Sequence, residues 1–295
     1  MPHLHHASSG TSWTAVLLTL VLLFAALVYL RGWFRLRSTS TSIRLWRAVS
    51  LVSGLLLIWI AIASPLAALD HELLTVHMIQ HLLLMTLAPP LIWLGAPVMA
   101  LAHGLPRQYV QRVLGPTFCW PPLQRLSRTL TRLTFTLLAA TAALVVWHIP
   151  AAFMLGLQSP AWHIVEHASF LVTGLLFWWP VIQPWPSAPR QDLSIILYLF
   201  FATLPCDILA GFLVFCDRVV YPVYFSSSQP FGFSALADQQ CAAALMWTCV
   251  TVVYLVAGAI LTMRLLSTSH HNHELMQSQP NSSVSPTAAQ RLEVA

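Results

Sequence analysis

Two pairs of histidines have the spacing that most directly indicates metal chemistry. His77 and His81 are four residues apart, and so are His163 and His167. On a helix, residues at this spacing share one face, with Cβ atoms about 5–6 Å apart. Two imidazoles on one face can bind one metal ion or face a shared cavity. A fifth histidine, His148, lies in another apolar segment, so three helices would have to meet to form a single site.

Several other side chains are candidate adjunct ligands. Met85 continues the His77–His81 face, Glu166 precedes His167, and Asp238 and Met246 lie in the last apolar segment. Imidazole with thioether suits Cu(I), and imidazole with carboxylate suits zinc. The carboxylate of Glu166 or Asp238 could instead accept a hydrogen bond from a histidine and so fix its tautomer. Asp238 could also pair with an arginine or a backbone group. The alternatives are histidines bonded to neighbouring helices and methionines that fill gaps in the core.

The segment His163-Ile-Val-Glu166-His167 also matches the HxxEH pattern of inverted zinc proteases. In that chemistry the two histidines bind zinc, and the glutamate acts as a general base on a zinc-bound water. Such a short pattern recurs by chance in a chain with 13 histidines. A zinc-dependent membrane hydrolase is therefore the alternative to a non-enzymatic metal carrier. Haem with axial imidazole ligands is a third hypothesis.

The composition requires that these residues be positioned by membrane-spanning helices. Of the 295 residues, 57% are hydrophobic and only 8% are charged, whereas soluble domains average about 25% charged residues. A soluble enzyme or a nucleic-acid-binding domain is thus excluded, and apolar runs beyond ~18 residues predict transmembrane helices. We expect an all-α, polytopic membrane protein. The predicted spans are 13–31, 43–64, 73–103, 131–150, 161–182, 193–216 and 236–264.

All 14 basic residues are arginines, and Arg-rich loops alternate with Arg-poor ones, so that all except Arg218 lie on one side of these spans. Five lie in or beside the connection between spans 1 and 2, and five lie in or beside the connection between spans 3 and 4. The positive-inside rule then predicts that the N-terminus is outside and the C-terminus is in the cytoplasm. This topology places all five histidines in the outer half of the membrane, whereas His103 lies at the inner end. The location of all five histidines in one half of the membrane favours one site open to the outside. It argues against two haems across the bilayer, which would need histidines in both halves.

The flanking segments and one span have features of their own. We expect residues 1–12 to form an external segment, 13–266 the membrane domain and 267–295 a disordered cytoplasmic tail, because the last is rich in polar residues. Histidines in these flanks are expected to be solvated. The third span contains Pro89-Pro90, which predicts a kink or a break. The five cysteines form no CxxC pair and predict no disulfide framework.

The motifs together resemble those of the caa3-type cytochrome c oxidase assembly factor family. The segment 64–97, SPLAALDHELLTVHMIQHLLLMTLAPPLIWLGAP, carries most of the resemblance. Further matches are Trp147-His148-x-Pro150, His163-x-x-Glu166-His167-x-x-Phe170, Phe177-Trp178-Trp179-Pro180, and Leu236-Ala237-Asp238-Gln239-Gln240 leading to Met246-Trp247. The departure is Cys241-Ala242, where the family is expected to have Ala-Gly.

The resemblance implies a seven-helix protein of the bacterial cytoplasmic (inner) membrane that takes part in maturation of a haem–copper oxidase. Its expected partners are a cytochrome c oxidase subunit during assembly, other copper chaperones and membrane lipid, with no nucleic acid. Copper is the expected metal, and zinc is the alternative. The predicted ligands are His77, His81, His148, His163 and His167, with Met85, Met246, Asp238 or Glu166 as adjuncts.

Overall fold

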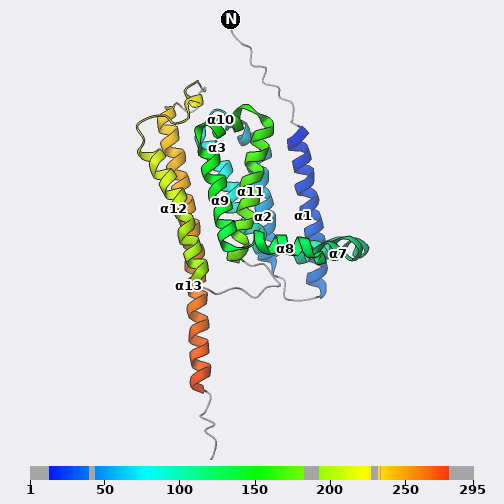
Figure 1. Cartoon of the computed structure of the whole chain (residues 1–295). Coiled ribbons are helices and arrows are strands. Elements are labelled where there is room, and N and C mark those ends of the chain that lie inside the picture. Colours follow the sequence, from blue (N-terminus) through cyan, green and yellow to red (C-terminus); the bar gives the residue numbers. More distant parts are fainter. Residues whose placement is uncertain (1–12, 40–43, 183–192, 227–231, 233, 279–295) are drawn as a thin grey trace, which may run out of the picture.

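The chain folds into a bundle of helices, most of which run along one direction (Figure 1). The computed structural model describes residues 13–39, 44–182, 193–226, 232 and 234–278, and these contain no strand. The long helices are α1 (Trp13–Thr39), α2 (Leu45–Ala63), α9 (Leu133–His148), α11 (Pro160–Ile182), α12 (Leu193–Phe215) and α13 (Ala235–Ser278). The shorter ones are η1 (Pro65–Leu69), α3 (Leu74–Leu82), η2 (Leu83–Leu87), α4 (Ala88–Leu94), α5 (Pro97–Gly104), α6 (Arg107–Tyr109), η3 (Val110–Leu114), α7 (Gly115–Cys119), α8 (Pro121–Leu130), α10 (Pro150–Gln158) and η4 (Pro222–Ser226).

The helices confirm the predicted class, an all-α polytopic membrane protein. Within the described residues, six stretches are long and apolar enough to cross a bilayer, namely Trp13–Ser38, Leu45–Leu69, Leu74–Leu94, Pro160–Ile182, Leu193–Phe215 and Ala235–Ser267. The helix pair α8 and α9, bent by 67°, makes a seventh candidate. With 16 residues, α9 is about 24 Å long, shorter than the ~30 Å hydrocarbon core. Arg132 precedes it and Pro150 follows it. The orientation of the termini relative to the cytoplasm stays a prediction.

The third predicted span differs from the structure in where it breaks. The helix continues through Pro89-Pro90, because the π-helical turn η2 directly before them changes the hydrogen-bond pattern where proline has no N–H to donate. The break comes at Gly95-Ala96 instead, where Ala96 has a left-handed φ of 49°. The predicted span 73–103 is therefore a continuous stretch over 74–94 followed by the separate helix α5.

The small residues of α1 and α5 let these two helices pack backbone to backbone. A Cβ atom on Gly32 would collide with the carbonyl group of Ala100, and one on Gly104 would collide with that of Val28. Small residues at contacts of this kind are common between membrane helices, whose association depends on close packing. Another face of α1 exposes large apolar side chains, with Phe24 65% exposed, as a lipid-facing helix does.

The helix α8 lies across one end of the bundle rather than along it (Figure 1). It carries Arg125 and Arg128 and exposes Leu126. Apolar and basic side chains on one short helix suit the membrane–water interface. The bend before α9 is therefore the point where the chain turns from the interface into the bundle.

The last helix is longer than predicted. Residues 267–278, which we expected to begin a disordered tail, continue α13. Neither proline nor glycine occurs between Gly258 and Pro280, so nothing in that stretch interrupts the helix. Its 44 residues span about 66 Å, twice a bilayer core, and its C-terminal part extends beyond the other helices (Figure 1). Residues 1–12 and 279–295, which include His3, His5 and His6, lie outside the described residues, and so do the side chains of His270, His271 and His273.

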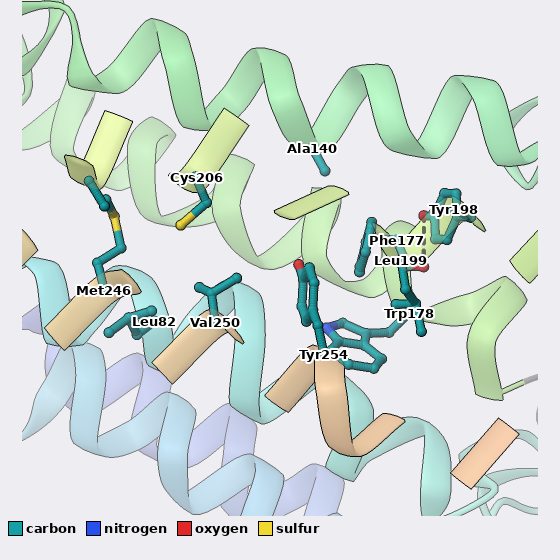
Figure 2. Packing of buried hydrophobic residues seen from close by; sticks show 11 residues of the cluster. Leu82, Ala140, Phe177, Trp178, Tyr198, Leu199, Cys206, Met246, Val250 and Tyr254 are labelled. Carbon is teal, nitrogen blue, oxygen red and sulfur yellow. Dashed lines mark hydrogen bonds between the residues drawn. The ribbon is translucent and has the colours of Figure 1, made fainter. Parts of the chain in front are cut away.

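An aromatic core joins the last helices. Tyr198 stacks on Phe177 at a centroid distance of 4.8 Å, and Phe177 in turn stacks on Tyr254 at 5.3 Å. The Tyr198 hydroxyl donates to the Phe177 carbonyl at 3.0 Å. Figure 2 shows these rings at one end of the cluster, with Cys206 and Met246 at the other end. Cys206 and Met246 line a cavity together with two of the histidines described below, His81 and His148.

Candidate metal centre

The site depends on how α3 begins. Leu73 is extended, and the α3 N-terminus has no capping side chain of its own. Asp238 of α13 supplies the cap: its Oδ2 accepts from the Leu74 N–H at 2.6 Å, and its Oδ1 accepts from the Thr75 N–H at 3.2 Å and from the Thr75 hydroxyl at 2.5 Å. A carboxylate here also complements the positive end of the helix dipole. The contact fixes the register of His77 and His81 relative to α13.

The structure brings together the five histidine rings that the sequence singled out. The ring centroids of His77 and His81 are 4.4 Å apart, and those of His163 and His167 are 4.2 Å apart. The two pairs meet where His77 stacks on His163 at 5.8 Å. His81 also lies 5.9 Å from His148 and 6.2 Å from His167. Rings from α3, α9 and α11 therefore form one histidine cluster, at the end of the bundle where α10 lies (Figure 1).

Glu166 lies between the first two of these rings. Its Oε1 is 3.4 Å from His77 Nε2 and 3.2 Å from His81 Nε2, and its side chain is fully buried. The facing helix α10 leaves room for it only because residue 156 is glycine: a Cβ atom there would lie 2.6 Å from Glu166 Oε2. The carboxylate thus fits between Gly156 of α10 and the two imidazoles of α3.

A second carboxylate extends the cluster toward the surface. Asp70 Oδ2 lies 3.5 Å from His163 Nε2, and Asp70 Oδ1 lies 3.6 Å from His71 Nε2. The exposed fraction of the side chain falls from 58% at His71 to 18% at His163 and to zero at His77. These residues form a line of ligand-type side chains from the surface to the buried rings.

Two groups of three residues have the spacing that a metal ion requires. One is His77, His81 and Glu166, and the other is Asp70, His77 and His163; within each, the candidate ligand atoms lie within 4.8 Å of one another. Ligands bound at roughly 2 Å from one ion lie within about 4 Å of each other. Each group therefore needs only small side-chain movements to enclose an ion, and His77 belongs to both.

Many polar atoms in the histidine cluster and on Glu166 have no hydrogen-bond partner among the described residues. They are both ring nitrogens of His77 and of His81, Nε2 of His148, His163 and His167, and both carboxylate oxygens of Glu166. The contacts of Glu166 with His77 and His81, and of Asp70 with His163, are within ion-pair distance but do not form hydrogen bonds. Buried polar atoms are almost always bonded, and a buried carboxylate without hydrogen bonds is costly. A cation at this point would supply both the missing partner and the missing charge, so the donor set fits a metal ion.

Buried aromatic side chains pack against the histidine cluster. Phe153 lies 4.9 Å from His77 and packs on Tyr221 at 4.2 Å. The Tyr221 hydroxyl donates to the His148 carbonyl, and the Tyr224 hydroxyl donates to the Asp70 carbonyl, both at 2.9 Å. Burial raises the pKa of both tyrosines well above the usual range, so they remain neutral donors. Of the residues in the line described above, His71 and His163 are the ones that reach the surface.

The adjuncts predicted from the sequence have three different placements. Glu166 lies inside the cluster, whereas Met85 and Met246 line a cavity beside His81 and His148. Both oxygens of Asp238 are bonded to the start of α3, which is the backbone alternative given for it, and its role as a ligand stays a prediction. The unpaired N–H groups of a helix start compete strongly for such a carboxylate.

Asp70 is the member of the cluster that sequence reasoning missed. It precedes His77 by seven residues, but the extended Leu73 separates it from α3, so helical spacing says nothing about their distance. The one available signal was its position at the mouth of the same span. His103, by contrast, lies outside the cluster, where its Nδ1 contacts the Met99 carbonyl at 2.9 Å.

The fold and the site together define a multi-pass membrane protein with a buried histidine–carboxylate cluster near one end of its bundle. Comparison with known proteins places it more closely. The chain belongs to the cytochrome c oxidase caa3 assembly factor (Caa3_CtaG) family, whose family model matches residues 27–268. This confirms the resemblance noted in the motifs.

Curated relatives include uncharacterized mycobacterial proteins. Those of Mycobacterium bovis and Mycobacterium tuberculosis are each 26% identical to this chain over 243 residues, which is 80% of the chain. One of Mycobacterium leprae is 22% identical over 82% of the chain. The chain spans 37% of the length of these relatives. No solved structure is significantly similar to it.

Proposed function

We propose that this protein is a copper-carrying assembly factor for a haem–copper cytochrome c oxidase. Family membership supports the role in oxidase assembly. Copper is the metal that such an oxidase needs at a centre buried in the membrane. A carrier that holds the ion among buried imidazoles can present it at a similar depth without exposing a bare cation to lipid.

The observation that carries the proposal is the set of unpartnered ring nitrogens around Glu166. In a purely structural cluster, the imidazoles would be bonded to carbonyl groups or hydroxyls of neighbouring helices. Only His148 has such a bond in the described structure, from Nδ1 to the Leu144 carbonyl at 2.7 Å. That bond orients the ring and leaves Nε2 as its ligand atom, which is how proteins commonly prepare a metal-binding histidine.

The excess of ligands suits a carrier better than a permanent site. Three imidazoles and two carboxylates form two overlapping groups that share His77, and the rings of His148 and His167 lie beside His81. One copper ion uses only some of them at a time, so it can change ligands stepwise without ever being free. The line from His71 through Asp70 to His163 offers the entry path.

The zinc-hydrolase alternative receives less support from Glu166. A general base must face the metal-bound water, but this carboxylate contacts His77 and His81 directly and is enclosed by α10. This geometry supports a ligand role for Glu166 better than a general-base role. Haem is disfavoured by space, because the cavity at His81 and His148 has a volume of about 40 Å³, against roughly 300–1,000 Å³ for small-molecule sites.

The remaining parts of the proposal concern place and partners. We infer a bacterial inner-membrane location, with the histidine end on the outside as the arginine pattern predicts. The partner is the oxidase subunit that receives copper, and other copper chaperones would supply the ion. The role is one of binding and transfer, without catalysis.

The direct test is the copper content of the purified protein. Wild type, His77→Ala and His103→Ala would be purified in detergent, loaded with copper and desalted, and the bound metal would be quantified by mass spectrometry. His103 is the matched control because its ring lies away from the cluster. We expect the His77→Ala protein to lose copper and the His103→Ala protein to keep it. Equal copper in both variants would remove His77 from the site.

A cellular test addresses the role in assembly. Cells lacking this protein would be complemented with wild type or with His77→Ala, and oxidase activity and copper content per oxidase would be measured. We expect the His77→Ala cells to contain copper-deficient oxidase, with partial rescue by added copper. Full oxidase activity in cells lacking this protein altogether would contradict the assembly role.

A further inference from the structure

A small cavity lies directly beside the buried imidazoles. It has a volume of about 40 Å³, whereas a single water needs about 10–15 Å³ by this measure. The cavity is bounded by α3 and η2, α9, α11, α12 and α13, and it contains His81 and His148 in its wall. It has room for an ion, and it is larger than the voids that close packing normally leaves.

Each of the two imidazoles in its wall has a buried ring nitrogen without a hydrogen bond. His81 is 5% exposed and His148 is 4% exposed. Both ring nitrogens of His81 and Nε2 of His148 have no hydrogen bond within the described part of the chain. Since the Leu144 carbonyl holds Nδ1 of His148, the lone pair of that ring is at Nε2. Two histidines that each have a ring nitrogen without a hydrogen bond therefore border a space that can hold an ion.

The same wall is rich in sulfur. Met78, Met85 and Met246 contribute thioethers, and Cys206 contributes a thiol. Figure 2 shows Cys206 of α12 and Met246 of α13 at the same end of the core cluster. Methionine often fills gaps in a core, but here the gap stays open beside imidazoles without partners. Thioether, thiol and imidazole together are the ligand set that selects Cu(I) over zinc or Cu(II).

We propose that this cavity is a second copper site, specific for Cu(I), formed by His81, His148 and the sulfur atoms of Met85, Met246 and Cys206. It rests on the proposed function and extends it. His81 belongs both to this site and to the cluster with Glu166. Copper can thus pass from a carboxylate–imidazole position to a sulfur–imidazole position by exchanging ligands around one shared ring.

The test is X-ray absorption spectroscopy of the full-length protein loaded anaerobically with Cu(I). We expect sulfur scattering in the first coordination shell of wild type. The triple variant Met85→Leu, Met246→Leu, Cys206→Ser should lose that sulfur scattering and bind Cu(I) at least tenfold more weakly, because leucine keeps the volume of methionine but has no ligand atom. Met99→Leu, a change on α5 away from the cavity, is the matched control and should leave both unchanged.

The outcomes separate the two proposals. If copper in the wild-type protein is bound through nitrogen and oxygen alone, the Cu(I) site is overturned and the proposed function stands. This outcome is measured on wild type, so it does not depend on whether the triple variant folds. Sulfur scattering that survives in the folded triple variant would also overturn it. A protein that binds no copper in either oxidation state would overturn both proposals.

Discussion

Replacing Gly156 with alanine tests the position of the Glu166 carboxylate without touching a ligand. The added Cβ would lie 2.6 Å from Glu166 Oε2. An ordinary contact begins near 3.4 Å, so the carboxylate must move by about 0.8 Å, whereas metal–ligand distances tolerate about 0.2 Å. Changes that displace a ligand indirectly typically reduce metal affinity about 10–100-fold. We expect a loss of copper affinity in that range.

The control for this prediction is Gly258→Ala, because a Cβ at Gly258 would have no neighbour within 4 Å. Both glycines lie inside helices, so both changes gain helix propensity, about 1 kcal/mol each. Copper affinity would be measured in detergent by competition with a chromophoric chelator, after thermal unfolding confirms that each variant is folded. If Gly156→Ala binds copper as tightly as Gly258→Ala does, Glu166 is not a ligand in this geometry.

Three further predictions follow from individual contacts. Asp238→Ala should lower the free energy of unfolding by about 1–2 kcal/mol, because it removes the cap of α3; an unchanged melting temperature would refute the capping role. His71→Ala should slow copper uptake in stopped-flow measurements without changing the final stoichiometry, because this ring lies at the exposed end of the entry line; unchanged uptake rates would place the entry elsewhere. Gly32→Ala should lower the melting temperature, since its Cβ would collide with the Ala100 carbonyl; a melting temperature equal to that of Gly258→Ala would refute the close packing of α1 on α5.

The sequence predicted the parts of this protein that depend on periodic patterns. Apolar runs located the long helices, and the four-residue spacing of His77 and His81 placed their rings on one face. The alternation of arginines then placed all five histidines at one end, where the structure brings their rings together. Metal binding by these rings stays a prediction.

The parts that the sequence did not predict depend on contacts between distant segments. Asp238 caps a helix that begins 164 residues earlier in the chain, and no local pattern indicates such a partner. Asp70, which the extended Leu73 separates from α3, contacts His163 on a distant helix. The π-helical turn before Pro89 has no sequence signature. The length of α13 was underestimated because polar composition was taken as disorder in a stretch without a helix-breaking residue.

The central claim is that imidazoles from separate helices bind one copper ion. Pulsed electron paramagnetic resonance of the Cu(II)-loaded protein tests it directly, because coupling to ring nitrogens counts the bound imidazoles. We predict couplings from more than one histidine in wild type, with one coupling lost in His77→Ala, another in His163→Ala and none in His103→Ala. Copper without nitrogen coupling, or spectra identical in all three variants, would contradict the account.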